Sequence, residues 1–254
     1  LLAGTAAVSF RFVDDAIAQA RERATLRNAF GGYVSPAVMD EILAGNLSPE
    51  LGGSRKTVCI MFSDIRGYTR RSEGLSPEQV IQFLNRYFDT VVGLIHSKGG
   101  CVVSFMGDGV MAVFGAPLDM PDHAVRSIRA ALEMRERLEE FNAERKEGPT
   151  LRIRIGINSG SAVAGEIGSI NKKEYTVLGD TVNIASRLES SVAQPMMVVV
   201  GENTFKAASG EFDCRSLGRV TLKGKKNVVE AYEVIGTLRA ADAAAAPSAA
   251  SREA

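Results

Sequence analysis

The sequence predicts an α+β fold with a ferredoxin-like core, in which helices cover one face of an antiparallel sheet and additional strands and helices follow. Two observations lead to this prediction. Between residues 57 and 160, short apolar runs and long amphipathic runs occur in the order strand, helix, two strands, helix, strand. The chain of 254 residues is also 45% hydrophobic, which is enough to bury one substantial core.

The first strand is predicted at residues 57–64, and a long amphipathic helix follows it. Ser76, Pro77 and Gln79 form a capping-box signal for the start of this helix. Apolar side chains then recur at helical spacing at Val80, Leu84, Tyr87, Val91 and Ile95. The glycine pair at 99–100 ends the helix.

A β-hairpin is predicted next. The apolar runs 101–106 and 110–115 flank a tight turn that contains Gly107, Asp108 and Gly109. The tip of this hairpin therefore carries a carboxylate.

The remaining elements continue the alternation. A second amphipathic helix is predicted from about Asp122 to Glu147, followed by a strand at 152–160. Beyond this core we expect a helix at 181–191, a strand at 196–200 and a final pair of strands around 218–234.

The amino-acid composition limits the classes of function that the chain can have. Thirty basic and thirty acidic residues cancel, so the balance of charge indicates neither a nucleic-acid partner nor an anionic-membrane surface. The three cysteines, Cys59, Cys101 and Cys214, are an odd number and widely spaced, so we expect reduced, largely buried thiols. The two histidines, His96 and His123, lie near no cysteine pair, which argues against a zinc site.

Two aspartates are candidate metal ligands. The segments FSDIRGYT and FMGDGVMAVFGAP place Asp64 and Asp108 at the ends of strand-like runs flanked by glycine. In the predicted topology these strands are adjacent, and two like charges placed together need a cation. Mg²⁺ prefers oxygen ligands and is commonly held by one or two carboxylates plus substrate phosphates. A single strand-end aspartate more often caps a turn, but the pair in this context favours a metal site.

Basic and amide side chains further along the chain are candidates for binding a nucleotide. Asn183 and Arg187 are four positions apart, and so share a face of the predicted helix, where the guanidinium could donate to phosphoryl oxygens. A solvated arginine with a capping asparagine is the alternative. Lys223 or Lys225 could hold the terminal phosphates, or both could simply face solvent at a hairpin tip.

Together these segments resemble the catalytic domain of the class III nucleotidyl cyclases, the adenylyl and guanylyl cyclases, over roughly residues 55 to 235. The resemblance implies the nucleotidyl cyclase fold and two Mg²⁺ or Mn²⁺ ions per site. It implies Asp64, Asp108 and the main-chain carbonyl of Ile65 as metal ligands. It also implies that Asn183 orients the ribose and that Arg187 stabilises charge in the transition state. One of Lys223 and Lys225 would match the family's phosphate-binding lysine, and the spacing leaves both open.

Assembly and location follow from the same resemblance. In the family the metal aspartates belong to one subunit and the asparagine and arginine to the other, which implies a homodimer here. Bacterial relatives of this type often follow a sensor domain and membrane helices. An upstream sensor and membrane region are therefore expected to be missing from this chain, with the catalytic domain at the cytoplasmic face of the cell membrane.

The resemblance also sets the domain boundaries. We assign residues 55–237 to the catalytic domain, 13–54 to connector helices and a linker, and 238–254 to a low-complexity, disordered tail. Residues 1–12 are apolar but too short to cross a bilayer alone, and they fit either the end of a transmembrane helix or a short buried helix.

The connector region contains two predicted helices. Residues 14–30 fit a signalling coiled coil or a solvated helix. Ser35, Pro36 and Gly45 predict a short capped helix.

Three positions depart from the family pattern. Adenylyl cyclases typically carry a lysine, and guanylyl cyclases a glutamate, where this chain has Ser104. The partner position for the base is Thr176, and Ser161 stands where some relatives carry a second phosphate-binding arginine. Hydroxyl groups at Ser104 and Thr176 discriminate weakly between adenine and guanine. We predict conversion of ATP to cyclic AMP, with GTP to cyclic GMP, or a catalytically weak regulatory domain, as alternatives.

Overall fold

The computed structural model describes residues 21, 36–45, 52–68, 76–144, 150–169, 172–208, 210–222 and 228–238. The chain divides into two compact units, Leu1–Pro49 and Glu50–Ala254. The predictions for residues 1–12, for the helix at 14–30 and for the tail beyond residue 238 fall outside the described residues, apart from Arg21.

The first unit contains the short helix α2, which spans Pro36–Leu43. It begins at the predicted proline, and Gly45, just past its end, adopts a φ of +74°. A left-handed residue there costs glycine little, which is why helices often end on it. The stop signal predicted at this position is thus confirmed.

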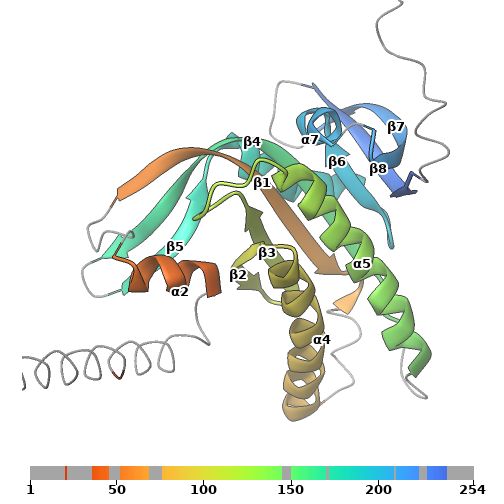
Figure 1. Cartoon of the computed structure of the whole chain (residues 1–254). Helices are drawn as coiled ribbons and strands as arrows, with labels where there is room; N and C mark the ends of the chain where they lie inside the picture. Colours follow the sequence, from red (N-terminus) through yellow and green to blue (C-terminus); the bar gives the residue numbers. More distant parts are fainter. Residues whose placement is uncertain are drawn as a thin grey trace, which may run out of the picture. The chain divides into compact units, whose positions relative to one another are not determined.

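The second unit is built on a mixed sheet (Figure 1). In the described part of the chain eight strands join this sheet in the order β2-β3-β1-β4-β6-β8-β7, with β5 paired to β4 off this path. The strands are β1 (Gly52–Ile65), β2 (Cys101–Met106), β3 (Gly109–Phe114), β4 (Ile153–Ser169), β5 (Lys172–Leu178), β6 (Val198–Gly201), β7 (Phe212–Thr221) and β8 (Val228–Thr237).

The predicted ferredoxin-like core is confirmed. Helix α4 (Pro77–Ser97) follows β1, the β2–β3 hairpin comes next, and α5 (His123–Glu144) leads into β4. The capping box forms at the start of α4: the main-chain N–H of Gln79 donates to Oγ of Ser76 at 3.4 Å, and that of Ser76 donates to Oε1 of Gln79 at 2.9 Å.

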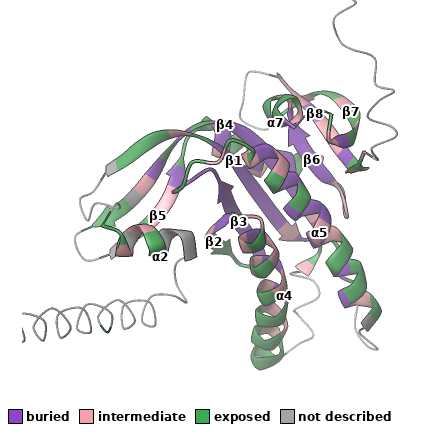
Figure 2. Cartoon of the chain, viewed as in Figure 1, coloured by how far each residue is buried: buried purple, intermediate pink, exposed green. Residues whose placement is uncertain are grey.

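Helices α4 and α5 cover one face of the sheet. Alternate residues of β1, β3, β4 and β6 point into the core they share, as the two-residue period of a strand requires. The core includes Met61, Val91, Ile128, Ile155 and Val200. Strand β3 is buried along its whole length, as the purple ribbon in Figure 2 shows. The intervening residues of β1 and β4 face the opposite side, where the candidate site forms.

That opposite face is covered in part by one continuous helical segment. Helix α6 (Asp180–Arg187) runs directly into the π-helical turn η1 (Leu188–Val192), so the predicted helix is confirmed with a wider final turn. The main-chain N–H of Ala193 donates to the carbonyl of Leu188 at 2.8 Å, a five-residue step. A Cβ added to Gly156 of β4 would lie 2.2 Å from the main-chain nitrogen of Glu189. Only glycine lets the segment approach this closely.

The structure differs from the sequence prediction in three ways. The sheet is not wholly antiparallel, because β4 and β6 run parallel, with Ile155 opposite Val198. A parallel pair needs a crossover, and α6 with η1 supplies it. Strand β5 and the short helix α7 (Glu202–Ala207) were not predicted. Within the described ranges strand β5 pairs only with β4, and it begins with charged residues, so it lacks the apolar run of a central strand.

Two further features are the state of the cysteines and the character of the helices. The three cysteines are free thiols: Cys59 and Cys101 are buried and Cys214 is half-buried. Burial raises the pKa of Cys59 to about 11, so this thiol is protonated at neutral pH. No helix within the described ranges combines the length and the apolar character that a membrane span requires.

Candidate active site

Asp64 and Asp108 lie together at one end of the sheet, as predicted. Asp64 is next to last in β1, and β1 pairs with β3 so that Ser63 faces Val110. Asp108 lies in the turn between β2 and β3. The main-chain N–H of Ile65 donates to Oδ2 of Asp108 at 3.1 Å.

Glycines make this close approach possible. Gly107 adopts a φ of +66°, in the left-handed region that favours glycine. A Cβ added to Gly109 would lie 3.2 Å from the carbonyl of Ser63 and 3.7 Å from Oδ1 of Asp64. The turn therefore packs directly against the end of β1, and Oδ1 of Asp64 faces that turn.

The carboxyl group of Asp108 is perturbed by its surroundings. Burial, and then the negative charge of Asp64, raise the pKa of Asp108 to about 6. This donor set of two adjacent carboxylates suits a hard divalent cation, which would relieve their repulsion. Within the described residues no cluster of three or more His, Cys, Asp or Glu side chains is arranged to hold a metal. Asp64 and Asp108 would thus leave positions open for phosphate and water.

Ile65 can take part only through its main chain. Its side chain is buried in the core beneath α4 and α5. Its main-chain N–H is engaged by Asp108. The carbonyl remains the only group of Ile65 able to act as a metal ligand, consistent with the predicted role.

The structure adds Arg154 and Glu189, which the sequence reading missed. Arg154 lies opposite Asp64 in the β1–β4 register, and its Nη2 donates to Oδ2 of Asp64 at 2.7 Å. The same Nη2 lies 2.8 Å from Oε1 of Glu189, and Nη1 donates to the carbonyl of Ser190 at 3.3 Å. The available signal was the charged residue between Ile153 and Ile155, on the face of β4 opposite the core.

Glu189 is a buried acid in the π-helical turn. Burial raises its pKa to about 7; the positive charge of Arg154 opposes this shift, while Asp64 and Asp108 add to it. Because Glu189 and Asp64 meet the same guanidinium, Arg154 connects the end of β1 to the segment that follows α6.

Asn183 and Arg187 share one face of α6, as predicted, but this face does not point at Asp64. Thr181 and Ala185 are buried against the sheet, whereas Asn183 is exposed and Arg187 half-buried. In the described part of the chain, the side chains of Asn183 and Arg187 form no hydrogen bond or ion pair with Asp64 or Asp108. The structure therefore does not bring the two halves of the predicted site together within one chain.

Ser104 and Thr176, the candidate base-binding residues, come from strands that approach each other, β2 and β5. Both side chains are half-buried. A β-bulge falls between Val102 and Ser104 and changes the register of the hairpin there. Oγ of Ser104 donates to the carbonyl of Phe105 at 3.4 Å, a weak local bond that a ligand could replace.

The remaining positions singled out from the sequence are Lys223, Lys225 and Ser161. Lys223 and Lys225 lie outside the described residues. Ser161 is exposed on β4, and its Oγ accepts a hydrogen bond from Nη1 of Arg55 at 3.3 Å.

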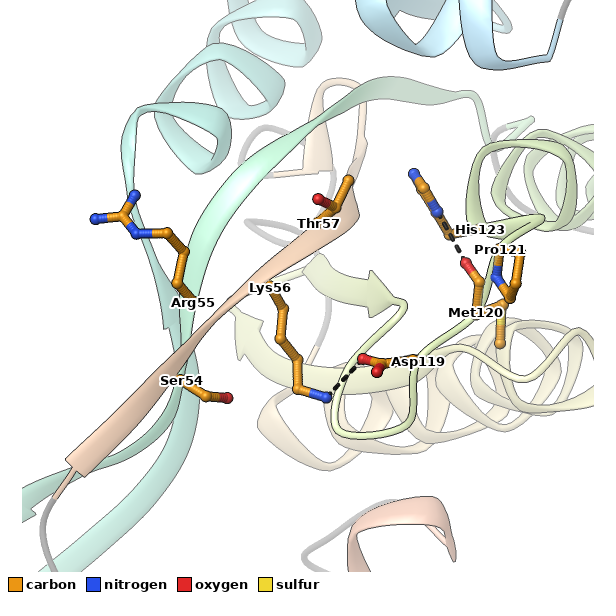
Figure 3. Close-up of a pocket in the computed structure, with 8 residues that line it drawn as sticks. All are labelled: Ser54, Arg55, Lys56, Thr57, Asp119, Met120, Pro121 and His123. Atoms are coloured by element: carbon orange, nitrogen blue, oxygen red, sulfur yellow. Dashed lines mark hydrogen bonds and ion pairs between the residues drawn. The ribbon is translucent and has the colours of Figure 1, made fainter.

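A pocket of about 450 Å³ lies elsewhere, at the beginning of β1 (Figure 3). Its lining comes from residues 54–57 and from the loop and helix start at 119–123, and includes none of the candidate site residues. Nζ of Lys56 donates to Asp119 at 2.7 Å and to the carbonyl of Pro117 at 2.8 Å, so its charge is already compensated.

Comparison with known proteins agrees with the family resemblance seen in the sequence. The family profile described as "Adenylate and Guanylate cyclase catalytic domain" matches residues 53–236. "Adenylate cyclase 1" of Rhizobium meliloti (strain 1021) is 39% identical over 199 residues, which are 77% of this chain and 30% of that protein. The chain therefore spans about a third of the length of this relative.

Two solved structures resemble the fold closely. The adenylyl cyclase CyaB from P. aeruginosa superposes with a TM-score of 0.69 at 32% identity, over 74% of this chain and 98% of that one. The guanylyl cyclase Cya2 also gives a TM-score of 0.69, at 36% identity, over 75% of this chain and 97% of that one.

Proposed function

The chain belongs to the family of adenylate and guanylate cyclase catalytic domains, and from this premise we propose that it converts ATP to 3′,5′-cyclic AMP and pyrophosphate. The observation that carries the proposal is the pairing of Asp64 with Asp108 at the end of β1, where burial and the charge of Asp64 raise the pKa of Asp108. Two neighbouring carboxylates repel each other, and such a pair is suited to bind divalent cations together with a triphosphate.

Asp64, Asp108 and the carbonyl of Ile65 would hold two Mg²⁺ or Mn²⁺ ions. Bound ions of this kind lower the pKa of a ribose 3′-hydroxyl and stabilise a leaving pyrophosphate. The role of the chain itself is to present two carboxylates on a rigid strand end and a tight turn.

Asn183 and Arg187 would act on the nucleotide from α6. Their exposed face allows the amide of Asn183 to orient the ribose and the guanidinium of Arg187 to donate to phosphoryl oxygens. Lys223 or Lys225 would hold the terminal phosphates. No histidine lies in the motifs that carry these residues, and we assign no general base.

We further propose that the site is shared between two copies of the chain. Asn183 and Arg187 face away from the sheet that carries Asp64, which supports a site completed by a partner subunit. The β4–β5 hairpin supplies an apolar surface for this contact. Val163 and Leu178 are paired across the hairpin and are 37% and 54% exposed. A two-fold homodimer would bury this surface and form two equivalent sites.

ATP is the preferred substrate and GTP the second candidate. Of the proteins named above, the one with the highest identity is an adenylate cyclase, and this similarity supports ATP as the substrate. The guanylyl cyclase Cya2 is also 36% identical, and the hydroxyls of Ser104 and Thr176 can donate or accept, so GTP has specific support. An upstream sensor and a place at the cytoplasmic face of the membrane remain predictions from the sequence.

The test is to incubate the protein with Mn²⁺ and either ATP or GTP and to separate the products by chromatography. Cyclic AMP from the wild-type chain, and none from the matched Asp108→Asn variant, is the expected result. Cyclic GMP as the main product would reverse the choice of base. No cyclic nucleotide from either substrate would favour the alternative of a regulatory domain without turnover.

A further inference from the structure

The guanidinium of Arg154 sits where it compensates the charge of the metal-binding carboxylates. Its side chain is only 13% exposed, and its Nη2 is within 2.8 Å of oxygens from two acids, Asp64 and Glu189. Asp64 is partly exposed and Glu189 is buried, and when both are ionised they carry more negative charge than one arginine can balance.

The two ion pairs of Arg154 leave part of its hydrogen-bonding capacity unused. An arginine that binds one carboxylate firmly uses two nitrogens in a bidentate contact. Here a single Nη2 serves both acids, and the buried Nε of Arg154 has no partner among the described residues. Oε1 of Glu189 likewise receives no hydrogen bond there, so its contact with Arg154 is an ion pair only. The guanidinium of Arg154 and the carboxyl group of Glu189 thus each have an atom with hydrogen-bonding capacity left.

A divalent cation on Asp64 would disturb this balance. Oδ2 of Asp64 accepts from Nη2 of Arg154 at 2.7 Å, so an ion held by Asp64 would compete with the guanidinium for the charge of this carboxylate. A doubly charged ion and a guanidinium that share one carboxylate repel each other, which weakens the bond between Arg154 and Asp64. Glu189 is the acid onto which Arg154 can withdraw.

We propose that Arg154 is an internal counter-ion that holds Asp64 in the metal-free protein and withdraws onto Glu189 when a divalent cation binds. Glu189 is then a positioning residue, which sets metal affinity through Arg154 rather than by ligating the ion. This inference rests on the proposed metal site at Asp64 and Asp108.

The experiment measures binding of Mn²⁺ alone to the full chain, without nucleotide, from the loss of the free-ion signal in electron paramagnetic resonance. The titration is done at pH 8, above the raised pKa of both Asp108 and Glu189. We expect Arg154→Ala to tighten Mn²⁺ binding about tenfold, because the competing cation is gone. We expect Glu189→Gln to weaken it by a similar factor, because Arg154 then has only Asp64 as a carboxylate partner.

The double variant distinguishes an effect that Glu189 exerts through Arg154 from a direct effect of its negative charge on the ion. If Glu189 acts through Arg154, adding Glu189→Gln to Arg154→Ala should change the Mn²⁺ dissociation constant less than about threefold. An equal effect of Glu189→Gln in both backgrounds would overturn the proposal. So would unchanged or weaker binding in Arg154→Ala.

Two controls complete the design. Arg66→Ala removes an exposed arginine beside Ile65 and should change binding less than about twofold; a tightening equal to that of Arg154→Ala would contradict the specific role of Arg154. Arg154→Gln serves as a second variant if Arg154→Ala does not fold, since its amide can still donate to Ser190. Mn²⁺ binding that survives in Asp64→Asn would overturn the metal assignment of the proposed function, and this inference with it.

Discussion

Asp64 and Arg154 face each other across the β1–β4 pair, with Nη2 of Arg154 donating to Oδ2 of Asp64 at 2.7 Å. The other oxygen of Asp64 faces the turn that carries Asp108. Asp64 therefore has the guanidinium of Arg154 on the side of η1 and the carboxyl group of Asp108 on the side of the hairpin.

Removing either metal carboxylate should abolish turnover without unfolding the chain. Asp64→Asn and Asp108→Asn keep the shape of the side chain but lose the charge that binds cations. The cyclase rate at saturating Mn²⁺ and the circular dichroism spectrum are the measurements. A variant that folds and keeps more than about a tenth of the wild-type rate would contradict the assignment.

Asp108→Asn should also stabilise the metal-free protein at neutral pH. The folded-state pKa of Asp108 is raised to about 6, above the ordinary value of 3.8, so the wild-type protein loses stability as pH rises through this window. Asparagine avoids that loss. Because Asp108 is only half-buried, water screens part of the effect, and we expect a gain of about 1 kcal/mol at pH 7.5.

The check is urea denaturation in the presence of a chelator at several pH values. The gain should shrink below pH 6 and become small near pH 4, because Asp108 is then protonated in the folded state and about half protonated in the unfolded chain. A gain that persists unchanged at pH 4 would show that it does not come from the charge of Asp108.

Much of the fold was predictable because its signals are local. The capping box at Ser76 and the glycines around Asp108 fix helix and turn through neighbours in the chain. The network of Arg154 and Glu189 was not predictable, because it joins residues from β1, β4 and η1 that meet only in the folded sheet. The parallel pairing of β6 likewise depends on a crossover rather than on local sequence.

Gly156 should be essential for the packing of η1 on the sheet. In Gly156→Ala the new Cβ would lie 2.2 Å from the main-chain nitrogen of Glu189 and 2.6 Å from the carbonyl of Ala185. Backbone cannot move aside cheaply, so we expect a loss of about 1–3 kcal/mol in the free energy of unfolding. The matched control is Gly93→Ala in α4, where a Cβ meets nothing within 4 Å and helix propensity should add stability. Equal stability of the two variants would contradict the packing described.

Ser104→Lys should shift selectivity toward ATP. An ammonium group can donate to N1 of adenine but meets a protonated N1 in guanine. The measurement is the ratio of kcat/KM for ATP to that for GTP, which we expect to rise about tenfold. An unchanged or inverted ratio would mean that Ser104, beside the β2 bulge, does not face the base.

The central claim is that two copies of this chain assemble each cyclase site. Co-expression of Asp108→Ala and Arg187→Ala chains tests it most directly, with cyclic AMP as the readout. Each variant alone should be inactive, whereas a mixed dimer carries one doubly damaged site and one intact site. With random pairing about a quarter of the wild-type activity should return. No recovery from dimers shown to be mixed would place Asp64, Asp108, Asn183 and Arg187 in one subunit and contradict the shared site.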